Sequence, residues 1–302
     1  MPLTPELRAV IARDMQSNRK FDGDTDIPEE CRAFDQLADM ETVEMPAVDG
    51  WPYKIYIFRA KNKTPDCPLH INAHGGGWLI GHMPNDTLWC AWLADQIQGV
   101  VMDIDYTTTE YASHPVALHQ GMDAARYAIA HCAEWGCDPK RISMGGYSAG
   151  GGLTMGAAVA SRMEGKPLPF CLLVNGYAPH DITYDEAVKD IPEYWKTQEH
   201  RNAGFGVLLS DDNAALTKDP AIFFVNAPDE VLASLPPTLI LAAAGDPFRF
   251  QNLEQATRLA SLGVEVTVKV YPDTVHGFIP HFMPHWREAA ALIVKAIKTT
   301  SL

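Results

Sequence analysis

Short apolar runs alternate with longer amphipathic stretches along most of the chain. Residues 53–58 alternate polar and apolar positions with a period of two, which is typical of a strand with one buried face. Further runs of strand length follow at 69–73, 100–105, 141–146, 170–175, 238–243 and 265–271. Amphipathic segments of helical length lie between the runs, at 86–97, 116–135, 149–163, 249–262 and 285–298. Strand and helix in repetition predict an α/β fold with a mostly parallel central sheet and helices on both faces.

Two stretches depart from this alternation. Residues 1–45 are charged and helical in pattern, and residues 177–232 contain several aromatic residues without a clear strand. Because a long loop without structure of its own is uncommon in a compact domain, the second stretch should fold. We expect the two stretches to form one helical cap, with 1–45 as its N-terminal part and 177–232 as its inserted part. The sheet and its helices then occupy 46–176 and 233–302.

The composition of the 302-residue chain is that of a globular protein, with 47% hydrophobic and 21% charged residues. Its formal net charge of −14 repels the phosphates of nucleic acids and anionic lipid headgroups, so we expect neither nucleic acid nor a membrane as a partner. The N-terminal residues lack the apolar stretch of a signal peptide, and no later run is long and apolar enough to span a bilayer. Six cysteines without a framework spacing favour reduced thiols, so the sequence predicts a cytoplasmic protein.

A serine lies between glycines at the junction of a strand and a helix. The pentapeptide 146–150, Gly-Tyr-Ser-Ala-Gly, follows the strand-like run 141–146 and opens the helical segment that follows. In this context a G-x-S-x-G sequence forms a nucleophile elbow, with Ser148 Oγ exposed at the carboxyl edge of the sheet. The N-terminus of the helix favours developing negative charge there. A glycine-rich turn with an incidental serine is the alternative.

A second glycine-rich stretch, His-Gly-Gly-Gly-Trp at 74–78, directly follows another strand. Acyl transfer requires amide N–H groups aimed at the developing oxyanion, and glycines allow the backbone to turn its amides inward. We expect Gly76, Gly77 and Ala149 to supply these amides. A phosphate-binding loop is excluded because the Gly-Lys-Ser/Thr of a Walker A motif is absent.

The candidate base is His276, which lies in a loop just beyond the run 265–271. A histidine at this place can accept the proton of a nucleophilic serine. His281 and His285 have the spacing of one helix face, but Pro280 and Pro284 interrupt any continuous helix through them. We therefore expect no metal site.

The candidate acid is Asp246, at the end of the strand-like run 238–243. A carboxylate here would hold the imidazole in the correct tautomer and stabilise the imidazolium that forms during the reaction. Asp273 is too close to the histidine in sequence to be the first choice. As an alternative, Asp246 simply caps the following helix.

The combination of these motifs resembles the hormone-sensitive-lipase-like carboxylesterases of the α/β-hydrolase superfamily. The matching stretches are HGGGW at 74–78, GYSAGG at 146–151, GDP at 245–247 and HGF at 276–278. The stretch 103–118 is also similar to a family motif, of which it retains Asp105, Tyr106 and Glu110. The resemblance covers roughly residues 50–298.

The resemblance implies an α/β-hydrolase fold with a helical cap and hydrolysis of a small-molecule carboxylic ester through an acyl-enzyme. It implies no cofactor and no metal, and it suggests a homodimer. It implies that Ser148 is the nucleophile, His276 the base and Asp246 the acid. It also implies that Gly76, Gly77 and Ala149 are the oxyanion donors. The chain departs from the family pattern at Tyr147, Thr107 and Phe250, which leaves the natural substrate open.

The aromatic residues of the cap and its surroundings predict a closed pocket that favours short acyl chains. The expected lining residues are Trp78, Tyr147, Tyr184, Trp195 and Phe205. If these rings pack inside the cap instead, the site is an open groove. Two other functions stay open: an amidase or peptidase that uses the same triad, and a ligand-binding protein of the same fold without turnover.

Overall fold

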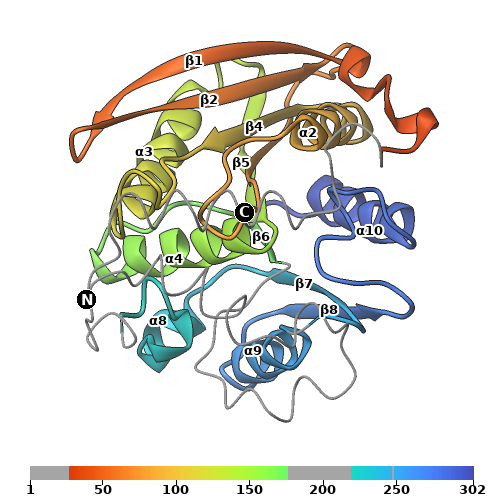
Figure 1. The fold of residues 1–302 in the computed structure, drawn as a ribbon. Coiled ribbons are helices and arrows are strands. Elements are labelled where there is room, and N and C mark those ends of the chain that lie inside the picture. Colours follow the sequence, from red (N-terminus) through yellow and green to blue (C-terminus); the bar gives the residue numbers. More distant parts are fainter. Residues whose placement is uncertain (1–26, 176–218, 247) are drawn as a thin grey trace.

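The computed structural model describes residues 27–175, 219–246 and 248–302, and within them one sheet of eight strands forms the centre (Figure 1). The strand order is β1-β2-β4-β3-β5-β6-β7-β8. In chain order the strands are β1 Ala38–Val48, β2 Trp51–Ala60, β3 Cys67–Ala73, β4 Val100–Asp105, β5 Cys137–Gly146, β6 Leu172–Asn175, β7 Thr238–Ala243 and β8 Val266–Tyr271. The pairs β1–β2 and β2–β4 are antiparallel and every other pair is parallel, so the predicted mostly parallel sheet is confirmed.

Helices cover both faces of the sheet, as predicted. They are α2 Pro84–Ile97, α3 Val116–His131, α4 Ala149–Met163, α8 Asp229–Ala233, α9 Arg249–Ser261 and α10 Trp286–Thr299. The helices α3, α4 and α9 pack on one face, and α2 and α10 pack on the other (Figure 1). Within the described ranges, short 3-10 helices lie at Glu29–Cys31, Phe34–Leu37 and Phe224–Asn226.

Two hydrophobic cores result, one on each face of the sheet. Ile71 of β3 packs with Leu153 of α4 in the first core, and Val101 of β4 packs with Ile293 of α10 in the second. All four side chains are 0 or 1% exposed. Burial of one such side chain contributes about 1.5–3 kcal/mol, so the two cores together fix the carboxyl ends of the strands, where the candidate site lies.

The first strand is a correction to the sequence analysis, which assigned 1–45 to a helical cap. Residues 38–45 belong to β1, which pairs with β2 in the register Val43↔Ile55. Of the eleven residues of β1, only Ala38 and Met45 are buried, because this strand lies at the edge of the sheet. Charged residues are common on edge strands because they discourage pairing with other chains, and here they obscure the period-two pattern.

The remaining cap prediction is only partly within the described residues. Residues 1–26 and 176–218 lie outside them. Of the inserted stretch, 219–232 is described, and its Phe224 is 1% exposed in the core beside α4. Phe34, from the N-terminal stretch, contacts Trp286 with a ring-centroid distance of 6.1 Å.

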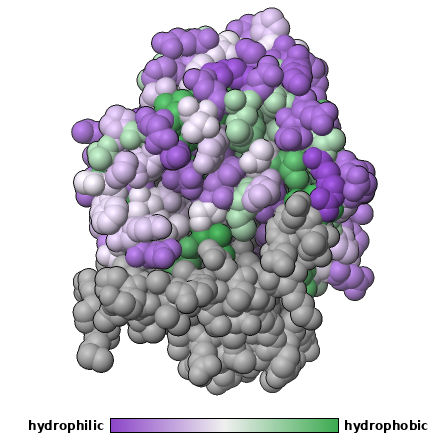
Figure 2. Space-filling model, turned by 45° about the horizontal axis from the view of Figure 1, so that its top comes forward, coloured by the Kyte–Doolittle hydropathy of each residue, from purple (hydrophilic) through white to green (hydrophobic). Residues whose placement is uncertain are grey.

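The surface is polar over much of the face shown in Figure 2, where hydrophilic residues dominate and apolar residues occur in small groups. Among the helices of the described ranges, none has both the length and the apolar character needed to cross a membrane. All six cysteines are buried and free.

Candidate active site

Ser148 occupies a strained turn between β5 and α4. Its backbone angles are φ 56° and ψ −123°, a combination that costs a residue with a side chain about 1–3 kcal/mol. The turn is closed by Gly150 N–H, which donates to Tyr147 O at 2.9 Å, and by Gly152 N–H, which donates to Ser148 O at 3.1 Å. The strand, sharp turn and helix expected of a nucleophile elbow are therefore present.

The glycines around Ser148 are required by close backbone contacts. A methyl group at Gly150 would overlap the carbonyl oxygens of Ala73 and His74 at the end of β3. A methyl group at Gly146 would overlap the backbone of Gly150 itself. The first turn of α4 thus lies directly on the end of β3, which brings Ser148 beside the loop that follows that strand.

The glycine-rich loop lies next to Ser148. A methyl group at Gly75 would be 3.2 Å from Tyr147 O and 3.5 Å from Ser148 Cβ. Gly76 has φ 126° and Gly77 has φ 61°, conformations that glycine adopts readily and other residues avoid. Within the described part of the chain, the backbone N–H groups of Gly76, Gly77 and Ala149 donate to no acceptor. Three unpaired donors near a serine are what an oxyanion hole requires.

Side chains from the segment after β4 hold this loop in place. Tyr106 OH donates to His74 O at 3.0 Å, and the Tyr106 ring stacks on the His74 ring at a centroid distance of 4.4 Å. Thr109 donates to Trp78 O from both its backbone N–H, at 2.8 Å, and its hydroxyl, at 3.0 Å. The sequence analysis did not single out Thr109. No sequence signal for this role was available, because the role depends on a carbonyl 31 residues away.

Asp246 and His276 meet at the same edge of the sheet, beyond β7 and β8. His276 Nδ1 lies 2.9 Å from Asp246 Oδ2, and the two side chains are 12% and 4% exposed. The other carboxylate oxygen, Oδ1, accepts the Phe248 N–H at 2.8 Å. The two loops are joined because Gly245 N–H donates to Thr274 O at 3.0 Å. The carboxylate that contacts the imidazole is thus the one at the end of the strand, and Asp273 is exposed.

The candidate metal pair does not form one helix face, in agreement with the two interrupting prolines. Helix α10 begins at Trp286, and His285 precedes it with φ 69°. His285 Nδ1 contacts Glu288 Oε2 at 3.2 Å on the surface.

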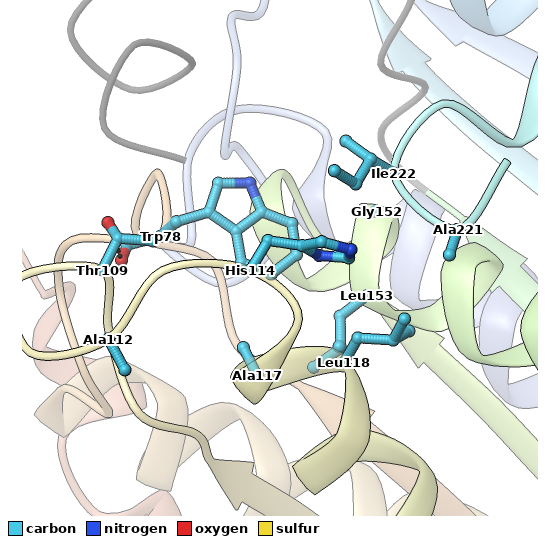
Figure 3. Close-up of a pocket in the computed structure, with 10 residues that line it drawn as sticks. All are labelled: Trp78, Thr109, Ala112, His114, Ala117, Leu118, Gly152, Leu153, Ala221 and Ile222. Atoms are coloured by element: carbon cyan, nitrogen blue, oxygen red, sulfur yellow. Dashed lines mark hydrogen bonds between the residues drawn. The ribbon is translucent and has the colours of Figure 1, made fainter. Parts of the chain in front are cut away.

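A small cavity of about 20 Å³ lies between the glycine-rich loop and the first turns of α4 (Figure 3). Its lining residues are Trp78, Thr109, Ala112, His114, Ala117, Leu118, Gly152, Leu153, Ala221 and Ile222. In the view of Figure 3, the side chains of Trp78 and His114 lie on one side of the cavity and Leu118 and Leu153 lie below them. The lining is mostly apolar and starts one helical turn from Ser148.

His114 is the main polar group of this lining. Its Nε2 lies 3.3 Å from Asp219 Oδ2. Burial lowers the pKa of His114, and the opposing effect of Asp219 is smaller. A neutral imidazole therefore faces the cavity at neutral pH.

The predicted pocket residues divide into three groups. Trp78 lines the cavity. Tyr147 does not: it is 7% exposed in the core on the other face of the sheet, with its ring 5.7 Å from that of Trp89. β5 ends at Gly146 and the chain turns sharply at Ser148, so the two neighbouring side chains lie in different surroundings. Tyr184, Trp195 and Phe205 lie outside the described residues.

Comparison with known proteins gives the same fold. A family profile described as "alpha/beta hydrolase fold" matches residues 70–280, more than half of the chain. The chain belongs to this family. The match confirms the expected α/β-hydrolase fold and the resemblance to the hormone-sensitive-lipase-like carboxylesterases.

Several proteins similar in sequence to this α/β-hydrolase are named as esterases. It is 26% identical over 238 residues to a versiconal hemiacetal acetate esterase of Dothistroma septosporum, across 76% of this chain and 72% of the relative. It is 27% identical over 267 residues to an esterase of Gibberella moniliformis, across 82% and 81%. A solved hyperthermophilic esterase from Pyrobaculum calidifontis superposes with a TM-score of 0.79 at 23% identity over 99% of both chains, which shows a shared fold.

The contact between α4 and β3 leads to a prediction about Gly150→Ala. Alanine is favoured over glycine inside a helix by about 1 kcal/mol, so helix propensity alone would stabilise the hydrolase. We expect a net loss of about 1–3 kcal/mol in the free energy of unfolding, because the added methyl group meets two carbonyl oxygens. The urea unfolding midpoint measures the change. An unchanged or higher midpoint would show that α4 does not lie as close to β3 as described.

Proposed function

We propose that this α/β-hydrolase is a serine carboxylesterase with Ser148 as nucleophile, His276 as base and Asp246 as the acid that orients it. The observation that carries the proposal is the 2.9 Å contact between Asp246 and His276 at the sheet edge where Ser148 stands in its strained turn. Membership of the family and the esterase names of its relatives support the same chemistry. The chemistry requires no cofactor.

In the proposed reaction, His276 accepts the hydroxyl proton while Ser148 Oγ bonds to the carbonyl carbon of the ester. The carbonyl oxygen becomes an oxyanion, which accepts hydrogen bonds from the unpaired N–H groups of Gly76, Gly77 and Ala149. The carbon–oxygen bond to the alcohol then breaks, and His276 returns the proton to the leaving alcohol. A water molecule releases the acid by the same steps in reverse, with His276 again as base.

Asp246 has two tasks in this scheme. Its Oδ2 accepts a hydrogen bond from the Nδ1–H of His276, so that the Nε2 lone pair of the imidazole is available for the serine proton. Its negative charge then stabilises the imidazolium. The amide of Phe248, bound to Oδ1, holds the carboxylate in the orientation that both tasks require.

The proposed substrate is a small ester with a short acyl chain. The cavity that begins one helical turn from Ser148 holds about 20 Å³, and the large side chains of Trp78, Leu153 and Ile222 are part of its lining. An acyl chain gains about 0.8 kcal/mol for each CH₂ group that it buries, until it reaches the end of the space. The name of the Dothistroma septosporum relative refers to an acetate ester, which is consistent with a short acyl group.

The proposed setting is the cytoplasm, with a small-molecule substrate and without nucleic acid or membrane as partner. The net charge of −14 supports this, because it disfavours contact with anionic surfaces. The homodimer implied by the family resemblance stays a prediction, which the mass measured by light scattering would test.

Replacement of Ser148 by alanine is expected to abolish ester hydrolysis, with a loss in kcat on the order of 10⁶, because the acyl-enzyme can no longer form. Hydrolysis of p-nitrophenyl acetate measures activity, and the urea midpoint checks that the fold is intact. An organophosphonate should label the wild-type protein at the peptide containing Ser148 and leave the variant unlabelled. A variant with a tenth of the wild-type rate would remove Ser148 from the mechanism.

Asp246→Asn should lower kcat by roughly 10⁴-fold, because the amide keeps the shape but presents the wrong hydrogen-bonding group to the imidazole. Asp273→Asn is the matched control: it removes the same charge from an exposed carboxylate in the loop of His276 and should leave the rate near normal. The reverse result, with Asp273→Asn inactive and Asp246→Asn active, would reassign the acid.

Acyl specificity tests the closed cavity. We expect p-nitrophenyl esters from acetyl to hexanoyl to be cleaved with higher kcat/KM than dodecanoyl esters, because longer chains must strain the wall or remain in water. Ile222→Ala enlarges the cavity and should shift the preference toward longer acyl chains. Val268→Ala, at an exposed position of β8, should leave the preference unchanged. A rate that rises through dodecanoyl would indicate an open groove.

Faster cleavage of the anilide than of the matching ester would identify an amidase.

A further inference from the structure

A buried polar network lies under the exit of the glycine-rich loop, and the proposed mechanism does not use it. Asp103 of β4 is 0% exposed, opposite Asn72 of β3 in the parallel register. Asn72 donates its side-chain N–H to Asp103 Oδ1. Asp103 Oδ2 contacts Nδ1 of His82 at 2.6 Å, and the His82 side chain is 9% exposed. A histidine and an aspartate are thus paired within the fold rather than on its surface.

His82 is also held at two further points. Its Nε2 lies 2.7 Å from Thr87 Oγ1 in the first turn of α2. Its backbone N–H donates to Asp105 Oδ1 at 3.1 Å, and Asp105 Oδ2 accepts the Tyr56 hydroxyl at 3.1 Å. The Tyr56 ring lies against the imidazole at a centroid distance of 4.3 Å. The side chain and backbone of His82 are therefore both fixed by the sheet and by α2.

His82 lies at the end of the glycine-rich loop, so its contacts hold that end of the loop in place. The loop that carries Gly76 and Gly77 leaves β3 at Ala73 and ends where α2 begins, directly after His82 and Met83. Its start is held by Tyr106 and its middle by Thr109, through the carbonyl oxygens described above. The anchor at His82 differs from these two carbonyl contacts because both of its partners can carry a charge. At the start of the loop, His74 Nε2 lies 3.8 Å from Asp105 Oδ1 and makes no hydrogen bond to it.

We propose that the buried pair of His82 and Asp103 is a positioning device for the oxyanion hole. It fixes the end of the glycine-rich loop, and the loop in turn aims the amides of Gly76 and Gly77 at the substrate carbonyl beside Ser148. His82 touches no substrate in this scheme and acts only through the loop. The proposal rests on the proposed function.

The energetics of buried charge support a positioning role. Removing two charges from water is costly, and well-packed apolar residues of similar size are often as stable or more stable. A buried pair with hydrogen bonds to Asn72 and Thr87 defines one geometry, however, whereas apolar contacts permit sliding. A loop that contains glycines at positive φ needs such a directional anchor, because its own backbone permits many conformations.

The charge state of the pair follows from its surroundings. The groups that face His82 are Asp103 and Asp105 from β4, Asp86 and Thr87 from α2, Tyr56 from β2, and His74 from the loop. Burial alone lowers the pKa of His82, but the hydrogen bond and charge of Asp103, with the charges of Asp86 and Asp105, raise it above the ordinary value of 6.5. Burial opposes ionisation of Asp103 too, yet the hydrogen bond and charge of His82 lower its pKa.

A basic limit on activity follows from the direction of this shift. Because the pKa of His82 is raised, the imidazolium is present at pH values below the shifted pKa. As the pH rises through that pKa, the pair loses the charge on His82 and keeps only a hydrogen bond from a neutral Nδ1–H, which holds the loop less firmly. A general base must be neutral to accept a proton, which limits hydrolases with a histidine base at acid pH. The rate should therefore fall at both ends, with the alkaline fall caused by His82.

The test compares His82→Asn with His119→Asn. Asparagine at position 82 can still donate a hydrogen bond but can neither be charged nor titrate. We expect kcat for p-nitrophenyl acetate to fall about 10²-fold with KM changed less than about threefold, as expected for a misplaced oxyanion hole, and the alkaline limb to disappear. The control removes a histidine paired with Asp49 at the same 2.6 Å distance, but the two control side chains are each 42% exposed. It should behave as wild type.

Phosphonate labelling separates this proposal from the proposed function. If wild type is labelled at Ser148 and His82→Asn is labelled at least about tenfold more slowly, the positioning role is supported. If both are labelled at Ser148 at the same rate, or if the variant keeps the alkaline limb, the positioning role is wrong while the esterase proposal stands. If wild type is not labelled at Ser148, the proposed function itself fails.

A measurement on the wild-type protein covers the case in which the variant does not fold. Histidine labelled with ¹⁵N reports by NMR whether the imidazole of residue 82 is charged. We expect its resonances to show an imidazolium at the pH of full activity and to titrate together with the alkaline limb of kcat. A neutral imidazole at a pH where the enzyme is fully active would overturn the proposal.

Discussion

The close approach of helix α4 to the end of strand β3 is the constraint on which the site depends. Because Gly150 carries no side chain, the helix can rest on the carbonyl groups of Ala73 and His74. The helix start then fixes the strained turn at Ser148, and the strand end fixes the origin of the glycine-rich loop. A single backbone contact thus places the nucleophile and the expected oxyanion donors relative to each other, before any side chain of the triad is considered.

The second half of the site is built independently, from the far strands of the sheet. Asp246 and His276 follow β7 and β8, and their loops are joined by the hydrogen bond from Gly245 to Thr274. Since all these strands are parallel, their carboxyl ends reach one edge, and chemically active loops from distant parts of the sequence meet there. Sheet topology therefore places the acid and the base at this edge, and the close contact at Gly150 places the serine there.

The glycine contact and the parallel sheet topology explain which parts of the fold and of the site could be predicted from the sequence. The parallel strands are buried apolar runs with local patterns. Asp246 could be preferred to Asp273 from its place at a strand end and because Asp273 is close to His276 in sequence. Strand β1 was not recognised, because an edge strand with two exposed faces has no apolar stripe. The pairing of His82 with Asp103 joins residues 21 positions apart, and its only local sign is a carboxylate inside the otherwise apolar run of β4.

The cavity in Figure 3 and the acid–base pair use separate parts of the chain. The walls come from Trp78, from the segment 109–118, from the second turn of α4 and from Ala221 and Ile222, whereas His276 and Asp246 come from loops beyond β7 and β8. Substrate preference can consequently diverge among descendants of such an enzyme without disturbing its chemistry. A library that randomises wall positions such as His114 and Ile222 would search new ester scaffolds while every variant inherits the same reactive serine.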